Sequence, residues 1–89
     1  MKAIVTVIGL DRTGIIAEIC TLLAGHDINI LDINQTVMKE FFTMTMLVDT
    51  EQSRLPFDEL SAALSEKGEE MKLNVRIQRE DIFYAMHKI

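Results

Sequence analysis

The sequence predicts an α+β domain whose elements follow the order βαββαβ. Four segments, either apolar and β-branched or regularly alternating, indicate strands. Two longer segments carry apolar residues at helical spacing and indicate helices. Each βαβ half must cross over right-handedly, so both helices are expected on one face of the sheet. The predicted fold is a ferredoxin-like plait with a four-stranded antiparallel sheet.

The first strand is predicted over Ala3–Ile8, an apolar and largely β-branched run. Gly9 is expected to end it. The alternation puts Ala3, Val5 and Val7 on one face and Ile4 and Ile8 on the other. Both faces of this strand are therefore expected to be apolar.

A helix is predicted over Thr13–Ala24, where apolar residues recur at helical spacing. These residues are Ile15, Ile16, Ile19, Leu22 and Leu23. Asp11 or Thr13 is expected to cap the N-terminus of the helix, and Gly25 to end it.

A hairpin is predicted next. The second strand, Ile28–Val37, changes the parity of its apolar residues near Ile30 and Leu31, which a β-bulge would reconcile. The third strand, Glu40–Asp49, alternates regularly. Its inward residues are Phe42, Met44, Met46 and Val48. Only two or three residues separate the two strands, so they should pair antiparallel.

The remaining elements complete the plait. Pro56 suits the first turn of a second helix, and Gly68 is expected to end it. The inward stripe of this helix is Phe57, Leu60, Ala63 and Leu64. A fourth strand over Lys72–Gln78 points Leu73, Val75 and Ile77 inward. Asp81 can cap a short C-terminal helix that carries Ile82, Phe83, Met86 and Ile89.

Length and charge limit the classes of function. Eighty-nine residues predict one domain, with a βαββαβ core over 1–79 and the C-terminal helix over 80–89. The net charge of −5 and the lack of a Lys/Arg cluster argue against nucleic-acid binding. A single cysteine excludes an internal disulfide and fits a reducing compartment. Without a recognisable cleavage site or a long apolar run, a cytoplasmic protein with no membrane partner is expected.

The stretch "GLDRTGII" places Gly9 and Gly14 at the spacing of a phosphate-binding loop. Such a loop would continue with Lys and then Ser or Thr, whereas this chain continues with Ile15 and Ile16. A nucleotide is therefore not the expected ligand. Gly14 either gives a ligand access to the backbone or lets the helix pack closely on the strand.

The segment "VIGLDRTGIIAEICTLLAGHDINILDINQTV" resembles the first half of an ACT domain. The shared pattern is the turn of Asp11, Arg12 and Gly14, an amphipathic helix, and then Ile-Asn-Ile at 28–30. Gly25-His26-Asp27 departs from it, because Gly or Asn often precedes the Ile-Asn-Ile. The chain is similar in length to stand-alone bacterial and archaeal ACT proteins with no assigned function.

The resemblance implies a site for an amino acid or a related small ligand, often at a dimer interface. Carried over by position, its residues are Gly9, Leu10, Asp11, Arg12, Thr13, Gly14 and Ile15, with Asn29, Ile30 and Asp32 from the second strand. No metal ligand, cofactor or catalytic residue is expected.

Physical chemistry favours the same turn. The first turn of a helix presents unpaired N–H groups and a partial positive charge, which suit a carboxylate. Arg12 could add a charge-assisted contact, and Asp11 or Asp32 could meet an ammonium group. Asn29 could donate or accept. Structural roles compete: Asp11 as an N-cap, Arg12 as a solvated surface residue, and Asn29 and Asp32 as ordinary strand residues.

The leading functional hypothesis is a non-enzymatic, amino-acid-sensing regulator that changes its self-assembly or its contact with an unidentified regulated protein. The alternatives are a protein–protein interaction module without a ligand and, less favoured, a small enzyme. No nucleophile–base pair or zinc spacing is visible, and Cys20 is interpreted as a core residue.

A homodimer is also expected. Phe41 and Leu47 turn away from the predicted helices, and the first strand is apolar on both faces. The C-terminal segment adds further apolar residues, namely Ile82, Phe83, Tyr84, Met86 and Ile89. So much exposed apolar surface is unusual in a small monomer, so the sheets or the terminal helices are expected to meet across a two-fold axis. The alternative is that the terminal helix covers part of this surface within one chain.

Overall fold

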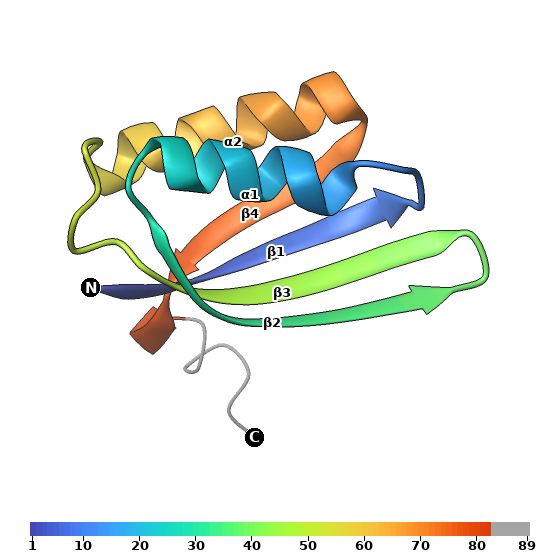
Figure 1. Ribbon diagram of the computed structural model, residues 1–89, viewed down its shortest axis with the longest axis horizontal. Helices are drawn as coiled ribbons and strands as arrows, with labels where there is room; N and C mark the ends of the chain where they lie inside the picture. Colours follow the sequence, from blue (N-terminus) through green and yellow to red (C-terminus); the bar gives the residue numbers. More distant parts are fainter. Residues whose placement is uncertain (83–89) are drawn as a thin grey trace.

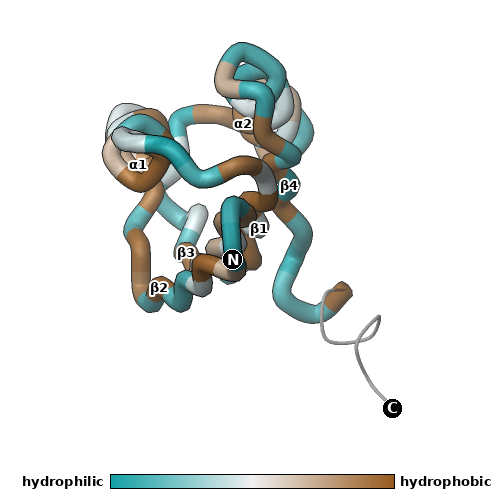
Figure 2. Tube along the Cα trace, turned by 90° about the vertical axis from the view of Figure 1, so that its right-hand side faces the viewer, coloured by the Kyte–Doolittle hydropathy of each residue, from teal (hydrophilic) through white to brown (hydrophobic). Residues whose placement is uncertain are grey.

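A computed structural model describes residues 1–82 of the chain and contains the predicted plait. Its elements are β1 (Lys2–Leu10), α1 (Ile15–Gly25), β2 (Asn29–Met38), β3 (Phe41–Asp49), α2 (Phe57–Met71) and β4 (Leu73–Arg79). The four strands form one antiparallel sheet in the order β2-β3-β1-β4. Both helices lie on one side of this sheet (Figures 1 and 2). The α+β fold class predicted from the sequence is confirmed.

The core lies between the sheet and the two helices. It forms because alternate residues of each inner strand point toward the helices while every third or fourth helical residue points back. The buried cluster combines Ala3, Val5 and Val7 of β1, Phe42, Met44, Met46 and Val48 of β3, Leu73, Val75 and Ile77 of β4, and Ile15, Ile19, Leu23, Leu60, Leu64 and Met71 of the helices. Among the described residues no polar or charged side chain is buried.

The predicted bulge in β2 is confirmed. Ile30 pairs with Val48 and Asp32 with Leu47, so Leu31 is an extra residue in the ladder. After the bulge, the odd-numbered residues of β2 share the face of the buried β3 residues. Two turn residues join β2 to β3, and Lys39 at the turn has φ 58°.

Two predicted boundaries are wrong, and each involves a glycine. β1 continues through Gly9, which pairs with Phe42 and Leu73. A Cβ at Gly9 would collide with the Leu73 side chain, so this glycine makes room within the sheet. α2 continues past Gly68 to Met71. Glycine is present at position 68 because the helix approaches β4 too closely there for a side chain. Close approach, rather than chain termination, explains both glycines.

Other termini differ by smaller steps. Pro56 is the N-cap of α2 rather than part of its first turn. Lys72 ends α2 in a left-handed conformation with φ 59°, and β4 begins at the next residue. The turn after α1 is left-handed at Asp27, with φ 59°. ACT domains often have Gly or Asn before the Ile-Asn-Ile, and Asp also tolerates this conformation better than most residues. Of the predicted C-terminal helix, residues 80–82 are helical and the rest lies outside the described residues.

Candidate functional site

A groove lies where the N-terminus of α1 approaches the edge strand β2. Its volume is about 340 Å³. Its lining comes from the β1–α1 turn, the first turn of α1, β2 and β3: Asp11, Arg12, Gly14, Ile15, Ile16, Ala17, Gln35, Val37 and Phe42. The groove therefore combines helix-terminal backbone, two charged side chains and an apolar wall.

The turn before α1 is built around Gly14, which is the N-cap residue with φ 93°. This left-handed conformation is costly for residues with a Cβ, so glycine is suited to the position. No side chain caps the helix. The predicted caps at Asp11 and Thr13 are therefore wrong: the chain reverses at Gly14, and the backbone N–H of Asp11 donates to the Glu40 carbonyl at 2.7 Å. That bond ties the turn to the β2–β3 hairpin.

The first turn of α1 offers unpaired backbone donors to the groove. The N–H of Glu18 donates to the Gly14 carbonyl at 2.9 Å, which begins the helical ladder. The N–H groups of Ile15, Ile16 and Ala17 precede that bond and so have no partner within the helix. All three residues line the groove. Together with the positive end of the helix dipole, they favour an anionic group there.

Charged side chains flank these donors. The Arg12 guanidinium donates to the Glu18 carboxylate at 2.8 Å, and both side chains are nearly half exposed. The other Glu18 oxygen lies 3.9 Å from Nζ of Lys67 on α2. Because guanidinium carries five donor N–H groups, this pair leaves Arg12 with donors for a ligand. Asp11 is exposed and supplies an acceptor on the same turn.

The opposite wall comes from β2 and β3. Val37 pairs with Phe42, and Gln35 pairs with Met44, so both β2 side chains face the α1 side of the sheet. Val37 is 54% exposed while Phe42 is buried beneath the groove. Ile16 of α1 adds a partly exposed apolar side chain. This wall suits an apolar or neutral group of a ligand, with the Gln35 amide beside it.

Comparison with known proteins identifies the family. An ACT-domain family model matches residues 2–78. The chain is an ACT-domain protein. It is 48% identical over 89 residues to a UPF0237 protein of Listeria monocytogenes, which covers all of both chains. It is 46% identical over 88 residues to a UPF0237 protein of Methanopyrus kandleri, covering 99% of this chain and 98% of that one. The family resemblance predicted from the sequence is confirmed.

A solved structure agrees with the fold. An ACT domain protein from Streptococcus pneumoniae superposes with a TM-score of 0.82 and 37% identity, over 93% of both chains. ACT domains often bind small ligands such as amino acids in regulation, and they commonly form oligomers. The groove of this ACT domain lies at the turn that the sequence motif marked.

The structure brings together four of the residues predicted for the site. Asp11, Arg12, Gly14 and Ile15 line the groove. Gly9 lies inside β1, facing Leu73, and Leu10 and Thr13 are exposed outside the groove lining.

The three residues predicted from β2 lie elsewhere. Asp32 pairs with Leu47 on the face opposite the helices, and its Oδ1 accepts a hydrogen bond from the Ile33 N–H at 2.9 Å. Asn29 lines a separate hollow at the far end of β2, with Asp27 and Gln52. Ile30 packs against the core. The β2 contribution to the groove is instead Gln35 and Val37, which the parity change after the bulge could have revealed.

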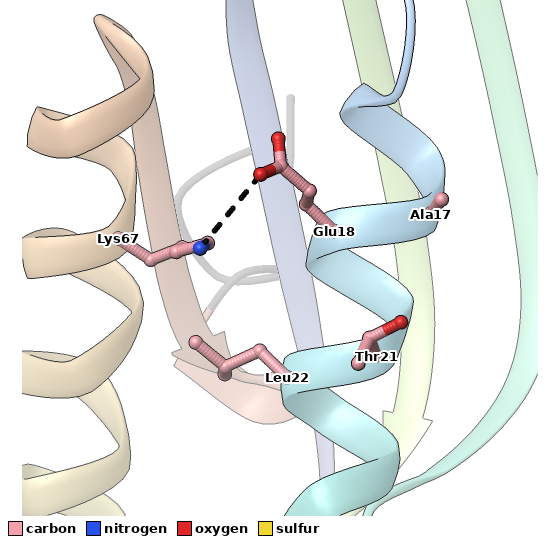
Figure 3. Close-up of a pocket in the computed structure, with 5 residues that line it drawn as sticks. All are labelled: Ala17, Glu18, Thr21, Leu22 and Lys67. Atoms are coloured by element: carbon pink, nitrogen blue, oxygen red, sulfur yellow. Dashed lines mark ion pairs between the residues drawn. The ribbon is translucent and has the colours of Figure 1, made fainter.

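A second hollow, of about 350 Å³, lies between α1 and α2 (Figure 3). It is lined by Ala17, Glu18, Thr21, Leu22 and Lys67. Glu18 and Lys67 point toward one another across it from the two helices (Figure 3). Ala17 borders both hollows, so the first turn of α1 separates them.

Three other features, namely metal ligands, a nucleophilic thiol and a membrane-spanning helix, were sought in the described part of the chain. Residues 1–82 contain no group of three or more His, Cys, Asp or Glu side chains placed to hold a metal ion. Burial raises the pKa of the Cys20 thiol, which opposes formation of the nucleophilic thiolate. Within the same residues no helix is long and apolar enough to span a bilayer.

Proposed function

We propose that this ACT-domain protein binds a free amino acid in the groove at the N-terminus of α1, and that it acts as a non-enzymatic regulator in homo-oligomeric form. The observation that carries the proposal is the set of unpaired N–H groups of Ile15, Ile16 and Ala17 lining a groove that also holds Arg12 and Asp11. Family membership supports it, because ACT domains often bind such ligands.

Each part of an α-amino acid has a matching group. The carboxylate is placed at the N–H groups of the first helical turn, where the helix dipole and Arg12 favour negative charge. The ammonium group of the ligand is expected to pair with the Asp11 carboxylate, which lies on the same turn. The side chain lies against Val37 and Phe42. A volume of about 340 Å³ falls at the small end of ligand sites, which are typically about 300–1,000 Å³.

Regulation would follow from differential affinity. A ligand shifts an equilibrium only if it binds one state more tightly than the other. The Arg12–Glu18 ion pair distinguishes the two states, because the carboxylate of a bound ligand competes with Glu18 for the Arg12 guanidinium. Glu18 also reaches Lys67, so the competition alters the contact between α1 and α2.

A protein–protein interaction module is the second candidate. The exposed apolar residues on the face opposite the helices favour it, since Leu10, Met38 and Phe41 are all more than half exposed. Under this alternative the groove holds no ligand.

A thermal-shift screen of the twenty amino acids tests the proposal. A ligand at a hundredfold excess over its Kd stabilises the folded state by about 2.7 kcal/mol. In a chain of this size that raises the melting midpoint by roughly 10 °C or more. The proposal fails if no amino acid gives a saturable shift.

Two variants locate the site. Val37→Glu puts a carboxylate into the apolar wall and should abolish the response to the ligand. Phe41→Glu is the matched control, because Phe41 is 52% exposed, against 54% for Val37, and lies on the other face of the sheet. It should keep a saturable response. If Val37→Glu responds like the unmodified chain, the ligand binds elsewhere.

A further inference from the structure

The second hollow, between α1 and α2, has a polar end and an apolar end. Its lining residues on α1 are Ala17, Glu18, Thr21 and Leu22, and α2 adds Lys67. Residues 17 and 21 are four apart, as are 18 and 22, so each pair lies on one side of the helix. Glu18 and Leu22 point toward α2, while Ala17 and Thr21 lie on the strip beside them (Figure 3). The polar end is therefore at Glu18 and Lys67, and the apolar end is at Leu22.

The apolar end is only partly covered by the protein itself. Leu22 packs against the core from its edge and is half-buried, and Ala17 beside it is exposed. Removal of such surface from water favours a ligand with an apolar body. The volume of about 350 Å³ is small for a ligand site, so the ligand should be a small molecule.

At the polar end, two opposite charges face each other without a hydrogen bond. Nζ of Lys67 lies 3.9 Å from Oε1 of Glu18, whereas N–H···O hydrogen bonds are about 2.7–3.2 Å long. Among residues 1–82, this ion pair is the only polar contact of Lys67. An ammonium group carries three donor N–H groups, so Lys67 has donors for a ligand. Its side chain is only 28% exposed, which limits the solvent that can satisfy them.

Arg12 holds the other side of the Glu18 carboxylate. Its guanidinium donates to Oε2 of Glu18 at 2.8 Å, while Oε1 is the oxygen nearest to Lys67. A carboxylate oxygen has two lone pairs, so Oε1 can accept a hydrogen bond from a ligand while Oε2 stays paired with Arg12. The acceptor and the donor at the polar end are therefore in place together.

These two charges favour a neutral polar group over a charged one. A carboxylate bound to Lys67 would also approach Glu18, and an ammonium group bound to Glu18 would also approach Lys67, so either meets a like charge. A hydroxyl group avoids both, because its oxygen accepts from Nζ while its proton goes to Oε1. With hydrogen bonds of about 2.8 Å on each side, one oxygen can reach both atoms across the 3.9 Å gap.

We propose that the hollow between α1 and α2 binds a small neutral molecule that carries a hydroxyl group on an apolar body. The hydroxyl group bridges Nζ of Lys67 and Oε1 of Glu18, and the apolar body lies against Leu22 and Ala17. A water molecule can bridge the same two atoms, but it leaves the apolar end in contact with solvent. The inference goes beyond the proposed function and does not depend on it, since neither Glu18 nor Lys67 lines the groove at the N-terminus of α1.

Three cyclohexane derivatives test the class of ligand, because they share one apolar body and differ in the polar group. Cyclohexanol, cyclohexanecarboxylate and cyclohexylammonium are each titrated into the isotope-labelled full chain, and the backbone amide signals are followed by NMR. Cyclohexanol should shift the amides of residues 17–22 and of Lys67 saturably, with a Kd of roughly millimolar order for so small a fragment. The two charged compounds should bind about tenfold more weakly or worse.

Variants of the ion pair test whether Glu18 and Lys67 set this preference. Glu18→Gln removes the charge that repels a carboxylate, so cyclohexanecarboxylate should gain about tenfold in affinity relative to cyclohexanol. Lys67→Met keeps an apolar stem and removes the charge that repels an ammonium group, so cyclohexylammonium should gain in the same way. Glu66→Gln is the matched control, because Glu66 is an exposed carboxylate of α2 outside the lining. It should keep the order of the three compounds.

The inference is overturned if no compound shifts the lining amides saturably, or if a charged compound binds the unmodified chain most tightly. It is also overturned if the cyclohexanol shifts centre on Gln35 and Val37, since that would place the molecule in the groove instead. A purely structural ion pair would lose stability in the variants without changing the order of the compounds, and that result would refute the hydroxyl bridge. None of these results bears on the amino-acid screen of the groove.

Discussion

Gly68 is the most informative position for a stability measurement, because two effects of similar size oppose each other there. Gly68→Ala favours the helix by about 1 kcal/mol, since glycine costs that much in a helix interior. Gly68 lies within α2, so this gain applies in full. On propensity alone the variant should be more stable than the unmodified chain.

Packing opposes this gain. A Cβ at Gly68 would lie 2.8 Å from the Leu73 carbonyl oxygen and 2.9 Å from Cγ2 of Val75. Overpacking costs about 1–3 kcal/mol, and a contact with backbone is at the upper end because the oxygen cannot rotate away. The net expectation is a loss of about 1–2 kcal/mol. In a domain of this size that lowers the melting midpoint by roughly 5–10 °C.

Urea unfolding followed by circular dichroism measures the difference. All variants should be compared at one protein concentration, since association changes apparent stability. Gly25→Ala is the matched control, because a Cβ at Gly25 meets nothing within 4 Å. It should gain about 0.5 kcal/mol. A Gly68→Ala chain that is more stable than the unmodified chain would show that α2 does not approach β4 as described.

Three further expectations concern single groups. Gly14→Val should cost about 1–2 kcal/mol of stability, because φ 93° is strained for a β-branched residue even though its Cβ would meet open space. The variant should lose the ligand response while keeping a native-like circular dichroism spectrum. A stable variant that still binds the ligand would contradict this. The Glu51 N–H, donating at 2.9 Å, lowers the pKa of Asp49 with help from the N-terminal ammonium. The stabilisation from a lowered folded-state pKa is fully present above the unfolded pKa of about 3.9 and is lost as pH falls through the lower, folded-state pKa. Asp49→Asn should therefore show a smaller loss of stability between about pH 5 and pH 3. Burial raises the pKa of Cys20, so its alkylation by iodoacetamide near neutral pH should be slow and should accelerate in urea; equal rates would place the thiol at the surface.

The fold was largely predictable because hydrophobic alternation carries it. Met44 and Met46 alternate with Thr43 and Thr45, and the structure buries both methionines. The parity change at Leu31 predicted the bulge. Gly9 and Gly68 were misinterpreted because a glycine looks the same in sequence whether it ends an element or admits a neighbouring one. Only the tertiary approach of β4 to both positions distinguishes the two roles.

The candidate site was predictable in part, for a related reason. The turn residues Asp11, Arg12 and Gly14 are contiguous, so a local motif identified them. The β2 residues depend on which face of the strand is turned toward α1, and the bulge decides that. Asp32 was carried over by position but lies on the face of the sheet opposite the helices, while Val37 lies in the groove.

The junction of α2 and β4 has a mechanical consequence. A single residue, Lys72, joins the two elements, and its amide donates to the Glu69 carbonyl at 3.2 Å. So short a link has no room for a hinge, so α2 and β4 should move as one rigid unit. α1, in contrast, hangs between a four-residue turn at 11–14 and a three-residue turn at 26–28. A displacement that begins at the groove should therefore rotate α1 relative to α2, while α2 keeps its place on β4. The motion would change the distance between Glu18 of α1 and Lys67 of α2, whose charged atoms lie 3.9 Å apart.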